Sequence, residues 1–240
     1  MKFRRVAVLV IVTIFLFNTV GFALTPSGKT YNGVDVSHYQ GNIDYEKLKQ
    51  AGYDYVYIKA GEGNTFTDPL FEQNYRRAKA QDMHIGFYYF VTARTVSEGT
   101  SQGARFARMI EGLEYDCMPA MDFEQLSGLS HSLINQIGAA FLKALEEDSG
   151  QPAVIYSNWS DAENIFGHAL SDYPLWIAEY SVSKPRELSA WDEWVGWQHS
   201  SSEHVAGISG RVDTDYFTRD ILIPDVDPTP SPTASPTVSP

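Results

Sequence analysis

Short apolar runs alternate with segments of helical periodicity along most of the chain. Between residues 31 and 217, runs rich in Val, Ile, Tyr, Phe and Trp are followed by polar turns, and then usually by stretches in which apolar residues recur every three or four positions. The runs predict β-strands and the stretches predict amphipathic helices. Eight strands are expected, at Gly33–Ser37, Tyr53–Ala60, His84–Val91, Met118–Glu124, Ala153–Ser157, Leu175–Tyr180, Val195–His199 and Arg211–Phe217.

The helical spacing predicts helices in several connections between these strands. One helix is expected to be capped by Asp68 and to run to about residue 81, and two more are expected around residues 103–113 and 133–145. The connections after Tyr180 and His199 are rich in Ser, Pro and Gly, so we expect little helix there.

Strands that alternate with helices imply parallel pairing through right-handed crossovers. Eight such strands predict an α/β fold, a closed (β/α)8-like barrel of the TIM type with some helices short or missing. The alternative is an open doubly wound sheet, which would need a glycine-rich nucleotide loop after the first strand. That segment, SHYQGNID, contains one glycine and matches no such loop.

The two ends of the chain differ from this central region. Residues 1–23 combine a basic start, an apolar run and small residues before a predicted cut after Ala23, which is typical of a secretory signal peptide; an uncleaved membrane anchor is the alternative. We expect an N-terminal lead at 24–30, a catalytic barrel at 31–224 and a disordered tail rich in Pro, Ser and Thr at 225–240. The protein is therefore expected to be secreted, extracellular or associated with the cell wall.

The composition excludes several classes of partner. The 240 residues, 43% of them hydrophobic, suffice for one core, and the formal net charge of −12 would become −15 without the three basic residues of the predicted signal. Such a chain is not expected to bind nucleic acid, or membranes in its mature form, through a basic surface. Cys117 is the only cysteine, so we expect no intramolecular disulfide, and the histidines lack the spacing of a zinc site. The protein is expected to be a monomer.

Acidic residues recur near the ends of the predicted strands. In parallel barrels the reactive groups project from the carboxyl ends of the strands. Carboxyl groups within apolar β-runs are costly to bury without partners, so their presence there indicates function more than packing. The candidates are Asp35, Glu62, Asp122, Glu124, Glu179 and Asp213.

The pair Asp122 and Glu124 is the most informative of these acids. Side chains alternate along a strand, so both should project to the same side. Of two neighbouring carboxyls one resists ionisation, and its raised pKa suits a general acid, while the other can stay charged and stabilise a cationic transition state. Asp215 is expected to be a structural charge, because Asp213 lies closer to the centre of its strand.

Aromatic and amide side chains accompany the acids at the strand ends. Sugar faces stack on aromatic rings, and sugar hydroxyl and amide groups form hydrogen bonds with polar side chains. The predicted substrate-binding residues are Glu62, Tyr88, Tyr89, Tyr156, Trp176, Glu179 and Gln198.

Six motifs in the same order resemble glycoside hydrolase family 25, the Ch-type lysozymes or N-acetylmuramidases. The resemblance runs from about Tyr31 to Ile223, nearly the whole predicted domain. The motifs are Gly33-Val34-Asp35-Val36-Ser37, Ile58-Lys59-Ala60-Gly61-Glu62-Gly63, Asp122-Phe123-Glu124, Leu175-Trp176-Ile177-Ala178, Trp197-Gln198 and Val212-Asp213.

The resemblance implies a reaction and roles for the matching residues. It implies cleavage of the β-1,4 bond between N-acetylmuramic acid and N-acetylglucosamine in bacterial peptidoglycan glycan strands, with retention and without metal or cofactor. Glu124 would be the general acid/base, and Asp35, Asp122 and Asp213 would complete the acidic cluster. The nucleophile stays open between an aspartate and the N-acetyl group of the substrate, and we favour the substrate-assisted route.

Two other classes stay open from the sequence. A chitinase-like N-acetylglucosaminidase usually has a further Asp two residues before the paired acids, where this chain has Ala120. A non-catalytic wall-binding barrel would not need the full set of acids.

Overall fold

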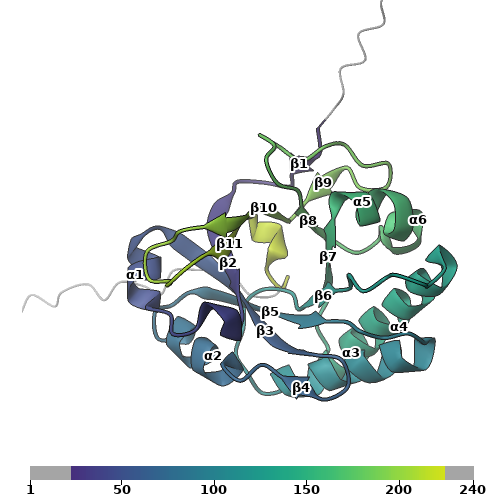
Figure 1. Cartoon of the computed structure of the whole chain (residues 1–240), viewed down its shortest axis with the longest axis horizontal. Coiled ribbons are helices and arrows are strands. Elements are labelled where there is room, and N and C mark those ends of the chain that lie inside the picture. Colours follow the sequence, from purple (N-terminus) through teal and green to yellow (C-terminus); the bar gives the residue numbers. More distant parts are fainter. Residues whose placement is uncertain (1–22, 225–240) are drawn as a thin grey trace, which may run out of the picture.

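The computed structural model describes residues 23–224 and shows a closed barrel of eight strands with helices outside it (Figure 1). The predicted signal peptide, apart from Ala23, and the predicted tail lie outside the described residues. The predicted barrel is confirmed, with all eight strands near their expected positions. In order around the barrel they are β2 (Tyr31–Val36), β11 (Val212–Phe217), β10 (Gly196–Glu203), β8 (Leu175–Ala178), β7 (Val154–Asn158), β6 (Ala120–Asp122), β5 (His84–Phe90) and β3 (Tyr53–Glu62), and β3 pairs with β2 to close the ring.

The last strand departs from the predicted all-parallel pairing. β11 is antiparallel to both of its neighbours, β10 and β2, whereas the other pairs within the ring are parallel. Only residues 204–211 join β10 to β11, and such a short connection allows a hairpin but not a crossover. The start of β11, and not its end, therefore lies at the mouth of the barrel.

Helices cover the left, lower and right sides of the barrel in Figure 1, and the upper side is covered by loops with the two-residue strands β1 and β9. As predicted, no helix lies in the described connection 179–192 or in 204–211. The predicted cap of α2 is wrong: Leu70 is the N-cap residue, and Asp68 instead accepts hydrogen bonds from the backbone of Leu70 and from His38. The helices are α1 (Tyr45–Gln50), α2 (Phe71–Lys79), α3 (Val96–Ile110), α4 (His131–Ser149), α5 (Trp159–Asp161) and α6 (Gly167–Leu170), with single turns at His38–Gln40, Ala162–Phe166 and Arg219–Ile221.

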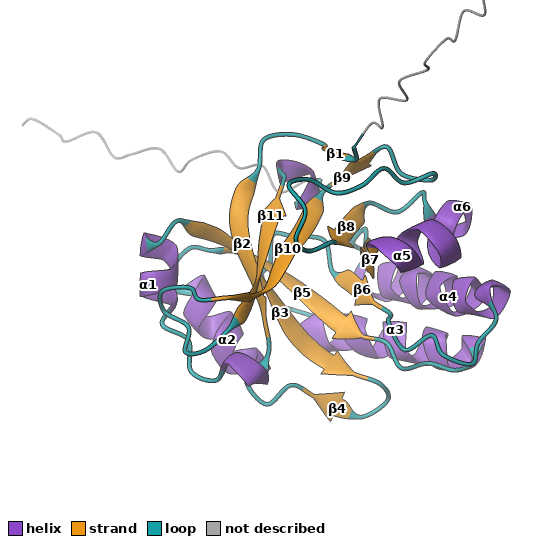
Figure 2. Cartoon of the chain, turned by 45° about the horizontal axis from the view of Figure 1, so that its top comes forward, coloured by secondary structure: helices purple, strands orange, loops and turns teal. Residues whose placement is uncertain are grey.

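Alternation along the strands separates two apolar layers. One layer fills the barrel with large rings, including Tyr57, Trp176 and Phe217, whose centroids lie 4.6–5.4 Å apart. The other layer lies between the strands and the helices. Figure 2 shows α3 and α4 side by side on one side of the barrel. The interior rings close the barrel below its mouth, so a ligand can enter only from above them.

The predicted lead, 24–30, packs on the barrel. Its residues Thr25–Pro26 form β1, which pairs in parallel with β9 (Glu193–Trp194), and Leu24 is buried. β4 (Phe66–Thr67) is a second short strand, antiparallel to the end of β3. Among residues 23–224, no helix has the length and hydropathy to cross a membrane.

Candidate active site

A polar pocket opens at the mouth of the barrel, and it collects side chains from seven of the eight strands or the residues just after them. Four carboxyl groups share it with aromatic and amide groups. Its lining consists of Asp35, Tyr88, Asp122, Glu124, Tyr156, Trp176, Tyr180, Gln198 and Asp213. All four acids predicted to be catalytic therefore meet in one place, together with four of the seven residues predicted to bind substrate.

The two acids near the end of β6 lie at different depths. Asp122 is the last residue of the strand and is buried, whereas Glu124 lies two residues further on and is exposed at the rim. Arg94 holds the loop after Glu124, because its guanidinium donates hydrogen bonds to the carbonyl oxygens of Gln125 and Ser127. This arrangement gives one enclosed carboxyl and one that can reach an incoming substrate.

The other two acids face each other across β2 and β11. Asp35 and Asp213 are directly opposite in the antiparallel register, so their side chains lie on the same face of the sheet. Asp35 is buried and accepts a hydrogen bond from Gln198 Nε2 at 2.7 Å, and Asp213 is partly exposed. The reversed direction of β11 is what brings Asp213 to the mouth beside Asp35.

Gln198 is held in one orientation by two phenols. Tyr156 donates to its Oε1 at 2.9 Å, and Tyr180 donates to the same oxygen. Because that oxygen accepts both bonds, the amide nitrogen points at Asp35. Tyr180, 43% exposed, lines the pocket but was not among the predicted substrate-binding residues. Its position just beyond β8, two residues after the Trp-Ile-Ala motif, was the signal in the sequence.

Enclosure and mutual repulsion raise the pKa values of the four acids. Burial, then the charge of Glu124 and that of Asp35, raise the pKa of Asp122, and burial followed by Asp213 raises that of Asp35. Loss of solvation in the pocket raises the pKa of Asp213 to about 6. Loss of solvation, Asp161 and Asp213 also raise the pKa of Glu124, although its residue is exposed at the rim. The cluster favours holding a proton near neutral pH, as an acid catalyst requires.

The geometry accords with what the comparisons with known proteins find. A sequence profile described as "Glycosyl hydrolases family 25" matches residues 34–208. The chain belongs to glycosyl hydrolase family 25. The resemblance seen in the six motifs is thereby confirmed.

Relatives and solved structures of the family resemble most of the chain. The "Autolytic lysozyme" of Clostridium acetobutylicum is 37% identical over 193 residues, which cover 80% of this chain and 57% of the relative. "Lysozyme M1" of Streptomyces globisporus is 31% identical over 201 residues, covering 77% and 67% of the two chains. The crystal structure of the bacterial lysozyme from Streptomyces coelicolor has a TM-score of 0.70 at 29% identity, covering 78% and 92%. The chain thus spans a little more than half of the clostridial relative's length.

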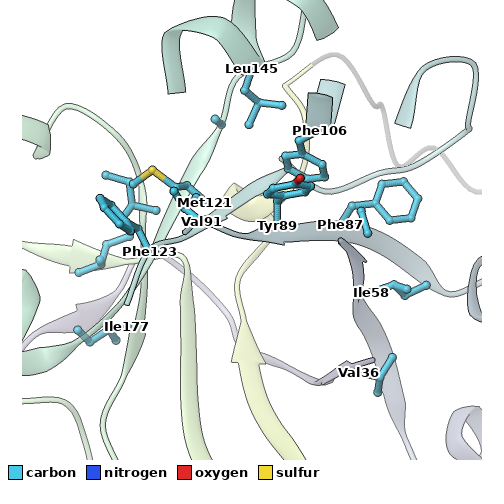
Figure 3. Close-up of a cluster of buried hydrophobic side chains, with 14 of the residues drawn as sticks. Val36, Ile58, Phe87, Tyr89, Val91, Phe106, Met121, Phe123, Leu145 and Ile177 are labelled. Atoms are coloured by element: carbon cyan, nitrogen blue, oxygen red, sulfur yellow. The ribbon is translucent and has the colours of Figure 1, made fainter. Parts of the chain in front are cut away.

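Three residues predicted to bind substrate do not line the pocket of this family 25 barrel, and two of them, Tyr89 and Glu179, are buried elsewhere. Tyr89 is fully buried and packs beside Phe106 of α3 (Figure 3). The two ring centroids lie 5.3 Å apart, and the Tyr89 hydroxyl accepts a hydrogen bond from Arg105. Adjacent residues of a strand face opposite ways, so Tyr88 and Tyr89 could not both enter the barrel. Glu179 is also buried outside the pocket, because its carboxylate accepts hydrogen bonds from the backbone and guanidinium of Arg186.

Glu62 lies near the pocket without lining it. The carboxylate of Glu62 forms an ion pair with Lys59, whose Nζ is 2.7 Å away, and both charges act on Asp122. The register of β3 shifts between Lys59 and Gly61, which displaces Glu62 from the alternation of the strand. Lys59 lowers the pKa of Asp122 and Glu62 raises it, so this ion pair tunes the enclosed acid instead of contacting the pocket.

Asp215 is more deeply placed than the sequence suggested. It is 1% exposed, and its Oδ1 accepts a hydrogen bond from Trp176 Nε1 at 2.9 Å. Asp215 does not line the pocket, and it is buried and bonded to Trp176 instead of forming a cap or an ion pair. In a strand parallel to the others, Asp215 would lie nearer the mouth of the barrel than Asp213. Because β11 is antiparallel, Asp215 lies deeper.

Proposed function

We propose that this family 25 chain is a secreted muramidase that hydrolyses the β-1,4 bond between N-acetylmuramic acid and N-acetylglucosamine in peptidoglycan. Relatives named lysozyme, autolytic lysozyme and N,O-diacetylmuramidase support this reaction. The observation that carries the proposal is that Asp122 and Glu124 share one pocket with Asp35 and Asp213. A binding site for neutral sugars alone would not require four acids whose pKa values are raised.

In the proposed first step Glu124 donates its proton to the glycosidic oxygen as the bond to the anomeric carbon breaks. Glu124 suits this role because it is exposed at the rim and its pKa is raised. The carbonyl oxygen of the substrate's own N-acetyl group attacks the anomeric carbon and forms a cyclic oxazolinium. Glu124 then takes a proton from water, which opens the ring with overall retention.

Asp122 is proposed to hold the N-acetyl group during this attack. Its Oδ1 is buried and has no hydrogen-bond donor among residues 23–224, so it is an acceptor open to the substrate's amide N–H. A charged Asp122 would also stabilise the positive oxazolinium, and the Asp35–Asp213 pair would add to that negative field. The pocket's rings for sugar contact are Tyr88, Tyr156, Trp176 and Tyr180.

The reaction is tested by mass spectrometry of fragments released from purified peptidoglycan. Borohydride reduction labels each new reducing end, so a muramidase yields fragments that end in muramitol. Fragments ending in glucosaminitol, or equal cleavage of chitin, would replace the proposal with a chitinase-like activity. Absence of any new reducing end would leave a wall-binding barrel, and Glu124→Gln serves as the matched inactive control.

The same proposal places the protein outside the cell as a wall-acting enzyme. Its support is the signal-like pattern of residues 1–23 and a substrate that lies beyond the membrane. N-terminal sequencing of protein recovered from the culture medium should begin at Leu24. Recovery of the intact N-terminus in the membrane fraction would indicate an anchor instead.

A further inference from the structure

Asp215 lies one residue layer below the pocket on the inner face of the barrel. Asp213 pairs with Asp35 at the mouth, and two residues further along the register Asp215 pairs with Gly33. Gly33 has no side chain, and a Cβ there would collide with the ring of Phe217 at 2.5 Å. The missing side chain at Gly33 thus leaves room for the Phe217 ring, which packs in the barrel interior below the pocket.

The two oxygens of Asp215 have different surroundings. Oδ1 accepts the bond from Trp176 Nε1, whereas Oδ2 is buried and receives no N–H or O–H donor within the described part of the chain. In the register of β2 and β11, Asp215 is the diagonal neighbour of Asp35 on the inner face, and the interaction of the two carboxyl groups shifts the pKa of each. Two neighbouring carboxylates that are both buried repel each other, so the pair is stabilised when they share one proton.

We propose that Asp215 is a positioning residue that stays protonated and donates its Oδ2 hydrogen to Asp35, which holds Asp35 as an oriented anion at the pocket floor. Its effect on rate rests on the proposed muramidase function. Asp35 then receives two hydrogen bonds, one from Gln198 above and one from Asp215 below. An anion fixed in this way stabilises the cationic intermediate without reorganising during the reaction.

The surroundings favour the proton on Asp215 and not on Asp35. The ionisable groups that act on Asp215 are Asp35 on β2, Asp213 on its own strand and the phenol of Tyr57 on β3, and none of them is cationic. Burial and then the charge of Asp35 raise the pKa of Asp215, whereas the hydrogen bond from Trp176 lowers it. The bond between the two acids raises the pKa of Asp215 further and lowers that of Asp35. Asp35 also faces the pocket and the amide of Gln198, where a charge is better solvated.

Two substitutions distinguish a neutral Asp215 from a charged one. In Asp215→Asn the amide oxygen can accept from Trp176 and the amide nitrogen can donate to Asp35, so this variant mimics the protonated acid. We expect its kcat/KM on solubilised peptidoglycan to stay within about threefold of the wild type, with an unchanged acid limb of the pH profile. Asp215→Ala removes the donor, so the pKa of Asp35 rises, and we expect the acid limb to move up by about one unit.

The direction in which the acid limb of Asp215→Ala moves shows whether Asp215 is protonated or ionised. If Asp215 were ionised, its removal would relieve repulsion, and the acid limb of Asp215→Ala would move to lower pH, which would overturn the proposal. Equal damage from Asn and Ala would overturn it too. If the wild-type protein does not cleave peptidoglycan at all, the muramidase function is refuted, but the proposal that Asp215 stays protonated is not.

A second measurement needs no activity. In protein labelled with ¹³C at aspartate carboxyls, the resonance absent from Asp215→Asn identifies Asp215. We expect it to keep the chemical shift of a protonated acid at pH 7, and the shift of a carboxylate there would overturn the proposal.

Discussion

Two strands of the barrel carry acids two residues apart, and they place them in opposite ways. β6 ends in Asp122 with Glu124 beyond it, and β11 begins with Val212 followed by Asp213 and Asp215. In the first pair the second acid is exposed at the rim, and in the second pair the second acid is buried below the pocket. The spacing is the same, but the depth of the second carboxyl differs.

Strand direction explains the difference. β6 runs toward the mouth, so each later residue lies further out, whereas β11 is antiparallel to its neighbours and each later residue lies further in. Alternation keeps both acids of a pair on the inner face in either case. The outer acid can exchange protons with substrate and water, while the inner one can act only through the groups that it contacts.

The largest predicted contrast comes from replacing a carboxyl group by an amide in the second acid of each pair, Glu124 and Asp215. Glu124→Gln removes the proposed proton donor, so we expect wall lysis to fall by about 10³-fold. Asp215→Asn replaces a neutral acid by a neutral amide, and we expect less than about threefold loss. Initial rates of reducing-end release from purified wall measure both.

Thermal unfolding provides the control for that pair. Glu124 is exposed, so Glu124→Gln should unfold within about 2 °C of the wild type. Two results would contradict the roles given to the exposed Glu124 and the buried Asp215. One is a loss of activity that follows the loss of folded protein, and the other is a larger rate loss for Asp215→Asn than for Glu124→Gln.

The first acid of β6 is expected to give the next largest effect. Asp122→Ala removes the acceptor proposed for the N-acetyl group, and we expect kcat to fall by about 10²-fold. Azide should not restore the rate, because the attacking group belongs to the substrate. Azide rescue with formation of a glycosyl azide of inverted configuration would instead identify Asp122 as the nucleophile. Mass spectrometry and NMR of the product separate these outcomes.

Charges beside Asp122 should move the pH profile in opposite directions. Lys59→Met removes the cation that lowers the pKa of Asp122, so the acid limb of kcat/KM should move to higher pH. Glu62→Gln removes an anion that raises that pKa, so the limb should move to lower pH. Each shift is expected to reach at most about one unit, and shifts of the same sign would show that neither charge acts through Asp122.

Much of the fold and pocket could be predicted because local patterns determine them. Eight β-rich runs predicted eight strands, and the paired acids on β6 needed only alternation to be placed together. The same alternation, applied to Tyr88 and Tyr89, would have left Tyr89 out of the site.

The direction of β11 could not be predicted from its own residues. Its composition fits a strand of either direction, and only the short connection 204–211 argued for a hairpin. The partner of Glu179 was similarly hidden, since Arg186 lies in a loop whose path depends on packing against the barrel. Contacts between residues distant in sequence therefore determine that Asp213 lines the pocket and that Glu179 instead pairs with Arg186.

The smallest predicted effect is a stability change at the mouth of β11. The folded-state pKa of Asp213, about 6, lies above its ordinary value, so the folded state binds more protons than the unfolded state, and stability falls as the pH rises through this range. Asp213→Asn removes this loss of stability with rising pH, and it also removes the repulsion that Asp213 exerts on Asp35. We expect its Tm to match that of the wild type near pH 4 and to exceed it by about 3 °C at pH 7, on the scale of ~1 kcal/mol. Calorimetry at both pH values measures this difference, and a Tm gain that is equal at pH 4 and pH 7 would mean that packing, not charge, limits stability at this position.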